Sequence, residues 1–348
     1  MIYILAYMAI RPLISVIVIA HERKEFILDA IRSLKDQSAP KESYEVLIIK
    51  KFVDREIDDF IAKNEYKNLL TTVDSLSGKI SEAMESCNGF YASFLEDDDL
   101  FVKNKISELI KIIKEYPDSI YIHNDHITMD KNGKLREFKL GIPFKNILNL
   151  KLNTTKFLDF AKVARNDPDF NLSSITIGID VLKEYMKKIE NINYVVDSYL
   201  YLSSIDYGRG RMVITPQKLT LYRYYRKSGM TIMPIEGRTP VNIGQYIAWQ
   251  SYFNKLYLGV FKTKIPMEIL NMKIIEEDIK ISILTEKLKP IKDVKSLVKF
   301  SIFGFKIREF YKIELVILSL LNVFSHTLSK NVYIKSGLFS SKHYPNID

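Results

Sequence analysis

The first 115 residues alternate between short apolar runs and longer segments in which apolar side chains recur every three or four positions. Residues 14–19 form a β-branched run, which is typical of a strand buried on both faces of a parallel sheet. The same patterns predict further strands at 44–49, 69–73 and 90–95, and helices at 26–34, 57–61, 80–87 and 102–115. Strand and helix therefore alternate four times. This predicts a doubly wound α/β fold, with a mostly parallel sheet and helices on both faces.

Beyond residue 115 the pattern is less regular. Residues 120–231 mix short strands with one clear helix near 181–188, and the chain after Pro240 has helical spacing. We therefore expect a first domain at 1–235, made of the halves 1–115 and 116–235, and a C-terminal helical region at 236–348.

The composition is that of an ordinary globular protein, with 47% hydrophobic and 27% charged residues, which excludes a disordered or low-complexity chain. The single cysteine, Cys87, excludes a disulfide framework and fits a reducing compartment. Residues 1–10 are apolar but lack the basic start of a secretory signal, so we expect a cytoplasmic protein.

The net charge of +9 has a strong local component near the C-terminus. Residues 287–312 hold eight basic side chains against only Asp293 and Glu309, and an apolar run follows at 315–324. That run is shorter than the roughly 20 residues with which a helix crosses a bilayer. Segment 287–328 is instead predicted to attach the protein peripherally to an anionic membrane, on its inner face. The alternative is that the run packs on the protein and the lysines are solvated.

Charge alone also suggests nucleic acid as a partner. We do not expect one, because the basic and aromatic residues are not interleaved on one surface as such binding requires. The sequence contains no Gly-x-Gly-x-x-Gly and no Walker A motif, which excludes a dehydrogenase-type or P-loop nucleotide site.

Four carboxylates, Glu96 to Asp99, directly follow the predicted strand 90–95. The turn His21-Glu22-Arg23 follows the first strand, and the carboxyl ends of parallel strands share one edge, so we expect the two segments to face each other there. Adjacent carboxylates suit Mg²⁺ or Mn²⁺ held together with substrate phosphates. The alternative is a solvated acidic turn in which Asp99 caps the next helix.

Several short motifs resemble those of family 2 glycosyltransferases with a GT-A fold. Residues 15–23 resemble the family's opening strand and nucleotide-contacting turn, Gly78-Lys79 its helix entry, and 88–91 its Gly-x-Tyr strand. Residues 94–99 resemble its Asp-x-Asp motif, with Glu96 at the first acid. The resemblance implies a metal on Asp98 and Glu96. It also implies nucleotide-sugar contacts from Ala20, His21, Glu22, Arg23, Lys79, Glu96 and Asp97.

The resemblance continues into the second half of the first domain. Residues 191–208 are similar to the segment that carries the family's Glu-Asp pair, in which Asp197 matches the catalytic general base and Val196 replaces the preceding acid. Asp206 is a lesser rival, and the alternative for Asp197 is a surface residue at a helix start. Residues 221–228 resemble a closing loop in which Arg223 and Arg226 would bind the diphosphate, unless they are exposed residues of an aromatic strand edge.

One departure from the family pattern concerns the nucleobase. The second strand ends in Lys50-Lys51, where the family has Asp-Asp-Gly-Ser, and this leaves the base of the donor open. The resemblance as a whole implies an inverting, metal-assisted transfer of a sugar from a nucleotide-diphosphate donor to a hydroxyl of a glycan or lipid-linked acceptor. The alternative is a catalytically inactive scaffold of the same fold in a glycan assembly pathway.

His123 and His126 have a spacing that suits a metal, but we expect them to be loop histidines.

Overall fold

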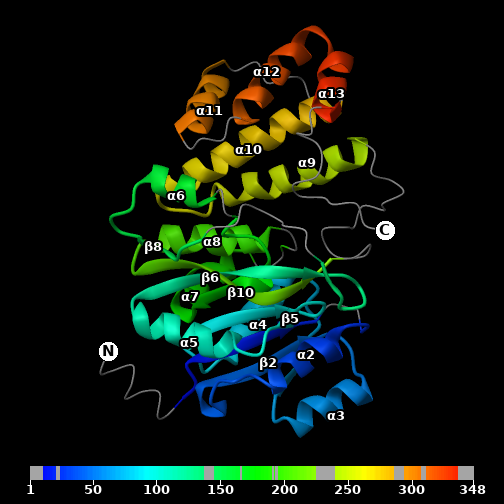
Figure 1. The fold of residues 1–348 in the computed structure, drawn as a ribbon, viewed down its shortest axis with the longest axis vertical. Coiled ribbons are helices and arrows are strands. Elements are labelled where there is room, and N and C mark those ends of the chain that lie inside the picture. The colour runs from blue at the N-terminus through cyan, green and yellow to red at the C-terminus, as the bar shows by residue number, and fades with distance from the viewer. Residues whose placement is uncertain are drawn as a thin grey trace. The chain divides into compact units, whose positions relative to one another are not determined.

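A computed structural model describes residues 11–20, 24–136, 145–164, 167–189, 192, 195–224, 240–285, 294–306 and 311–335. The chain divides into two compact units (Figure 1). The first is drawn from Met1–Glu137, Pro143–Thr155 and Asp167–Tyr224, and the second from Phe138–Ile142, Lys156–Asn166 and Tyr225–Asp348. The boundary that the sequence predicts between residues 235 and 236 lies outside the described residues and stays a prediction.

The first unit is built on one sheet with the strand order β3-β2-β1-β4-β9-β6-β10-β5, in which β7 also pairs with β6 and β8 with β10. The strands are β1 (Ile14–Ile19), β2 (Tyr44–Lys50), β3 (Lys67–Leu70), β4 (Tyr91–Glu96), β5 (Leu100–Phe101), β6 (Ser119–Met129), β7 (Leu135–Arg136), β8 (Leu148–Lys151), β9 (Ile175–Gly178) and β10 (Arg211–Arg223). The first four strands pair in parallel, whereas β9 runs antiparallel to both β4 and β6. The predicted doubly wound α/β fold is confirmed.

Helices connect these strands in the predicted order. They are α2 (Ile27–Lys35), α3 (Arg55–Lys63), α4 (Leu76–Glu85), α5 (Lys105–Glu115), α7 (Ile179–Tyr185) and α8 (Val196–Tyr207). The third strand ends at Leu70 rather than at the predicted residue 73, because the chain then turns toward α4. The Ser75 hydroxyl caps that helix by accepting a 3.1 Å hydrogen bond from the amide of Gly78.

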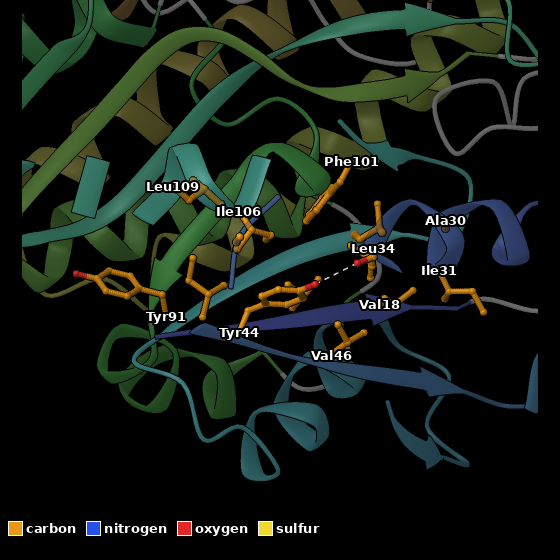
Figure 2. Packing of buried hydrophobic residues seen from close by; sticks show 14 of the residues in the cluster. Val18, Ala30, Ile31, Leu34, Tyr44, Val46, Tyr91, Phe101, Ile106 and Leu109 are labelled. Carbon is orange, nitrogen blue, oxygen red and sulfur yellow. Dashed lines mark hydrogen bonds between the residues drawn. The ribbon is translucent and has the colours of Figure 1, made fainter. Parts of the chain in front are cut away.

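Alternate residues of β1 face opposite sides of the sheet, and both sides are covered by helices. Ile14, Val16 and Val18 belong to a core formed with α2, α3 and α5, and Figure 2 shows Val18 close to Ala30, Ile31 and Leu34 of α2. In the same view the hydroxyl of Tyr44 donates to the carbonyl oxygen of Leu34 at 3.3 Å. Because β4 lies on the other side of β1 from β2 and β3, the right-handed connection through α4 crosses to the opposite face. There α4 contacts α7.

Gly89 lets the chain pass close to β1 just before β4 begins. A Cβ at this position would lie 2.6 Å from the backbone nitrogen of Ser15, closer than packed atoms approach. Its amide donates to the Ser15 hydroxyl at 2.9 Å. Gly89 therefore sets the entry of β4 beside β1.

The second unit is helical, which confirms the predicted C-terminal helical region. Its helices are α6 (Phe157–Ala164), α9 (Pro240–Tyr257), α10 (Lys264–Leu284), α11 (Val294–Lys306), α12 (Tyr311–Phe324) and α13 (His326–Lys335). A shared core takes Ile279 and Ile283 from α10, Phe300 from α11 and Leu315 from α12. Within the described residues, no helix combines the length and the hydropathy that crossing a membrane requires.

Lys312 is buried in this unit and binds Glu276 of α10, which also contacts Lys280 at 2.6 Å. Burial alone would raise the pKa of Glu276, but the charges of Lys280 and Lys312 outweigh it and hold that pKa well below its ordinary value. The expectation that the lysines of 287–312 all serve a solvated or membrane-facing surface is therefore wrong for Lys312. This pairing was not predictable from local sequence, because Glu276 lies 36 residues from Lys312 along the chain.

Candidate active site

The acidic turn lies at the carboxyl edge of the parallel strands. β4 ends at Glu96, which stands beside Ile19 in the parallel register of β1 and β4, so Ala20 and Asp97 leave the sheet at the same edge. This confirms that the turn after β1 begins beside the acidic run. His21, Glu22 and Arg23, which we expected to face the acids, lie outside the described residues, and so does Arg226.

The carboxylates of this turn are buried. Asp97 and Asp99 are each only 1% exposed, and Asp98 is also buried. The alternative of a solvated turn capped by Asp99 is therefore wrong, and α5 starts after Asn104 instead. Burial, together with the charge of Asp98, raises the pKa of Asp99 to about 8. Its Oδ1 accepts a hydrogen bond from the amide of Arg223 at 2.9 Å, while its Oδ2 has no hydrogen-bond partner among the described residues.

Arg223 holds this turn from the end of β10. The antiparallel register of β5 and β10 brings Arg223 beside Asp98, and its Nε donates to the Asp98 carbonyl oxygen at 2.8 Å. Its Nη1 donates to the carbonyl oxygen of Lys131 at 2.7 Å, and the guanidinium lies over the ring of Phe26 at 4.3 Å. The side chain is 2% exposed, so the alternative of an exposed strand-edge residue is wrong. These contacts tie three loops of the carboxyl edge together.

Lys79 reaches the same edge from the other face of the sheet. It lies in the first turns of α4, is buried, and donates from Nζ to the carbonyl oxygen of Ala20 at 3.2 Å. The structure thus brings together Lys79 and Ala20, two of the residues expected to contact the nucleotide sugar, and that role stays a prediction.

The end of β2 is where the sequence departs most from the family pattern. Lys50 is buried, forms an ion pair with Asp58 of α3 at 2.8 Å, and donates to the carbonyl oxygen of Phe52 at 2.7 Å. Lys51 pairs with Asp74 in the approach to α4. Each lysine is therefore matched by a carboxylate from another loop or helix, and the strand end carries no net charge from these four groups.

Asp197 lies in the first turn of α8, two residues after Val195, whose backbone is strained. Val195 has φ +53° and ψ +29°, a left-handed conformation that is unfavourable for a β-branched side chain. Asp197 Oδ1 accepts a hydrogen bond from the amide of Ser198 at 2.8 Å. The rival Asp206 lies in the last turn of the same helix, where it is buried and accepts a 2.7 Å hydrogen bond from the Tyr185 hydroxyl. That bond gives Asp206 a packing role between α7 and α8.

A short segment, residues 167–174, connects the acidic turn with the start of α8. At one end the Ser173 hydroxyl accepts a 3.0 Å hydrogen bond from the amide of Glu96. At the other end Asp169 accepts one from the Ser198 hydroxyl. Asp167 and Asn171 have positive φ angles, so the backbone of this segment is constrained as well.

Asp169 was missed by the sequence analysis. The sequence signal that could have revealed it was the cluster Asp167-Pro168-Asp169 with Asn171, which are turn-forming residues within a few positions of one another.

The prediction that the two histidines lie in a loop is wrong: His123 and His126 lie on β6. Both are largely buried, and burial lowers the pKa of His123 to about 4. Its Nε2 donates to the Phe170 carbonyl at 2.8 Å, so it supports the 167–174 segment.

The described residues contain no group of three His, Cys, Asp or Glu side chains placed to hold a metal by themselves. A Mg²⁺ or Mn²⁺ ion that shares its shell with phosphates and water needs only one or two carboxylates. The crowded, desolvated acids of the turn and the unpartnered Oδ2 of Asp99 fit such an ion, since each would be stabilised by a nearby positive charge.

The mixed sheet, with an acidic turn at its carboxyl edge, has the architecture of a GT-A fold. The sequence model of glycosyl transferase family 2 matches residues 15–171, which places this part of the chain in that family and confirms the resemblance seen in the sequence. No match is found among curated proteins.

Solved structures of S. aureus TarS share the fold. TarS 1-349 in complex with UDP is 12% identical, with a TM-score of 0.53 over 96% of this chain and 94% of that one. The same fragment in complex with UDP-GlcNAc is also 12% identical, with a TM-score of 0.54 over 93% and 92% of the two chains. Without a ligand, it has a TM-score of 0.56 at 11% identity, over 93% and 91%.

Proposed function

We propose that this protein transfers a sugar from a nucleotide-diphosphate donor to a hydroxyl of a glycan or lipid-linked acceptor, with inversion at the anomeric carbon. The observation that carries the proposal is the buried acidic turn beside the Lys79–Ala20 contact, at the carboxyl edge of a family 2 domain. The TarS structures that share the fold hold UDP and UDP-GlcNAc, which makes a uridine donor the first to test.

Asp197 is the proposed general base. It takes the proton from the acceptor hydroxyl while that oxygen attacks the anomeric carbon, and the bond from this carbon to the diphosphate oxygen breaks on the opposite face. Attack from the face opposite the leaving group inverts the configuration. The link from Asp197 through Ser198 and Asp169 to segment 167–174 supports this role, because that segment also hydrogen-bonds to Glu96.

Asp98 and Glu96 are the proposed ligands of Mg²⁺ or Mn²⁺. When bound, the ion would neutralise charge that builds up on the diphosphate leaving group. The protein's own part is to keep these carboxylates in place, and Arg223 does this through the Asp98 carbonyl. We propose His21, Glu22, Arg23, Asp97 and Arg226 as further donor contacts on the family resemblance alone.

The second candidate is a scaffold that has lost transfer activity. Two observations favour it: the family's acid at the end of β2 is replaced by Lys50, which Asp58 neutralises, and Val196 replaces an acid next to Asp197. The buried acids favour the enzyme, because a binding surface gains nothing from carboxylates whose burial destabilises their charged form.

Calorimetric titration of the full chain with UDP, GDP and their common sugars, with and without Mn²⁺, tests the donor site. Metal-dependent binding of one nucleotide is the expected result, and a product assay with that donor then separates transfer from binding. Binding without turnover supports the scaffold. A folded protein that binds no nucleotide under any condition overturns the donor-site assignment.

We also propose that the reaction takes place in the cytoplasm at the inner face of a membrane. The single cysteine, Cys87, and the basic segment before α12 support this placement. A lipid-linked acceptor would be delivered there without leaving the bilayer.

A further inference from the structure

The C-terminal helices of the second unit have one buried face and one exposed face that is also apolar. Leu297 and Phe300 of α11 and Leu315 and Leu318 of α12 belong to the core shared with α10. Large apolar side chains are nevertheless exposed on all three helices α11, α12 and α13. They are Val298, Ile302, Phe305, Ile317, Leu320, Val323, Phe324, Leu328 and Val332.

Helix α11 combines this apolar surface with positive charge. Its exposed positions recur at three- and four-residue spacing, which places them on one side of the helix. They are Lys295, Val298, Lys299, Ile302, Phe305 and Lys306. Phe305 is 65% exposed, and α11 contains no acidic residue. The stripe therefore combines apolar and cationic groups.

Helix α12 contacts α11 and also exposes apolar side chains, together with Glu314 near its start. Ile317, Leu320 and Phe324 follow one another at helical spacing and are exposed, with Phe324 at 88%. The basic residue of this helix, Lys312, contributes nothing to the stripe, because it is buried against Glu276. The burial pattern thus separates a structural lysine from the lysines that face outward.

We propose that this face, Lys295 to Lys306 of α11 with the exposed side of α12, docks on an anionic lipid surface. The apolar side chains enter the boundary between headgroups and acyl chains, and the lysines extend along the same stripe to lipid phosphates. The combination of the two residue types on one stripe selects this partner. A second copy of the chain docked through α11 would bring the lysines of two α11 helices together, and α11 itself has no acidic residue to offset their repulsion.

Co-sedimentation of the full chain with vesicles tests the proposal. We expect pelleting with phosphatidylcholine vesicles that contain 30% phosphatidylglycerol, weak pelleting with phosphatidylcholine alone, and a decline as salt rises. Ile302→Ser with Phe305→Ser removes apolar contact, and Lys295→Gln with Lys299→Gln and Lys306→Gln removes charge. Each set is expected to lower the bound fraction at least fivefold.

Leu135→Ser is the matched control, because Leu135 is an exposed apolar residue of the first unit. It is expected to pellet like the unsubstituted chain. Circular dichroism of every variant establishes that it is folded.

Two outcomes overturn the docking face. One is equal pelleting of both variant sets and the control, and the other is the absence of any vesicle binding by the full chain. Light scattering that shows a dimer dissolved by Phe305→Ser, without vesicle binding, assigns the face to self-association instead. None of these outcomes depends on sugar transfer, so the vesicle experiment tests the docking face even if the protein binds no nucleotide.

Discussion

The Nε of Arg223 lies 2.8 Å from the carbonyl oxygen of Asp98, and this hydrogen bond joins the last residue of β10 to the acidic turn. The same residue donates its amide to Asp99. The resemblance to family 2 places this arginine on the diphosphate, whereas in the structure its Nε and Nη1 donate to the carbonyl oxygens of Asp98 and Lys131. We propose that Arg223 is a positioning residue, which acts on the donor through the carboxylates that it holds.

Arg223→Lys is expected to weaken this turn while it keeps the charge. An ammonium cannot reach both the Asp98 and Lys131 carbonyls, so a buried oxygen loses its partner and the free energy of unfolding falls by about 2 kcal/mol. We further expect the Mn²⁺ concentration for half-maximal activity to rise about tenfold. Chemical denaturation and metal titration measure the two effects. An unchanged Mn²⁺ requirement in a destabilised variant would reduce Arg223 to a purely structural role. Arg136→Lys, at an exposed ion pair with Asp130, is the control.

Asp197→Asn is expected to remove the general base without disturbing the donor site. The variant keeps the shape of the side chain, so kcat should fall by about 10² to 10⁴ while donor affinity stays the same. Asp206→Asn is the comparison, because Asp206 bonds Tyr185 and is expected to affect the free energy of unfolding more than kcat. Near-normal kcat in Asp197→Asn, with a large loss in Asp206→Asn, would exchange the two assignments.

Asp98→Asn is expected to abolish the metal dependence of donor binding. The amide retains one oxygen but loses the charge that favours a divalent cation over water. Titration calorimetry should then give the same weak nucleotide affinity with and without Mn²⁺. Asp118→Asn, at the amino end of β6 where Asp118 pairs with Arg211, is the control and should retain the metal effect. Retention of that effect in Asp98→Asn removes the metal assignment.

His123 is expected to make the fold less stable in weak acid. Burial lowers its pKa from 6.5 to about 4, so between these values the unfolded chain binds more protons than the folded one. The free energy of unfolding therefore falls as the pH drops from 6.5 toward 4, by about 3 kcal/mol at most from this residue. Urea denaturation at pH 7.5 and pH 4.5 measures the change, and His123→Gln should show a smaller one. Equal changes in both proteins would place the acid sensitivity elsewhere.

The strand and helix alternation was predictable because each parallel strand is buried on both faces and has to be a continuous apolar run. β1 and β2 illustrate this, with six residues of each strand buried. The carboxyl edge was predictable for the same reason, since topology alone brings Ala20 and Glu96 together.

The partners of the charged residues could not be predicted from the sequence. Arg223 meets Asp98 across 125 residues, and Asp169 meets Ser198 through a loop whose positive φ angles have no sequence signature beyond turn-forming residues. In the sequence, Lys50 left the nucleobase of the donor open. In the fold it is neutralised by Asp58, a residue on the next helix.

The left-handed Val195 places backbone strain at the start of the helix that carries Asp197. Its conformation costs on the order of 1 kcal/mol or more, and glycine, which a single nucleotide change can introduce at a valine codon, would remove most of that cost. Valine stands immediately before the helix that carries Asp197, so the local strain is stored next to the proposed base.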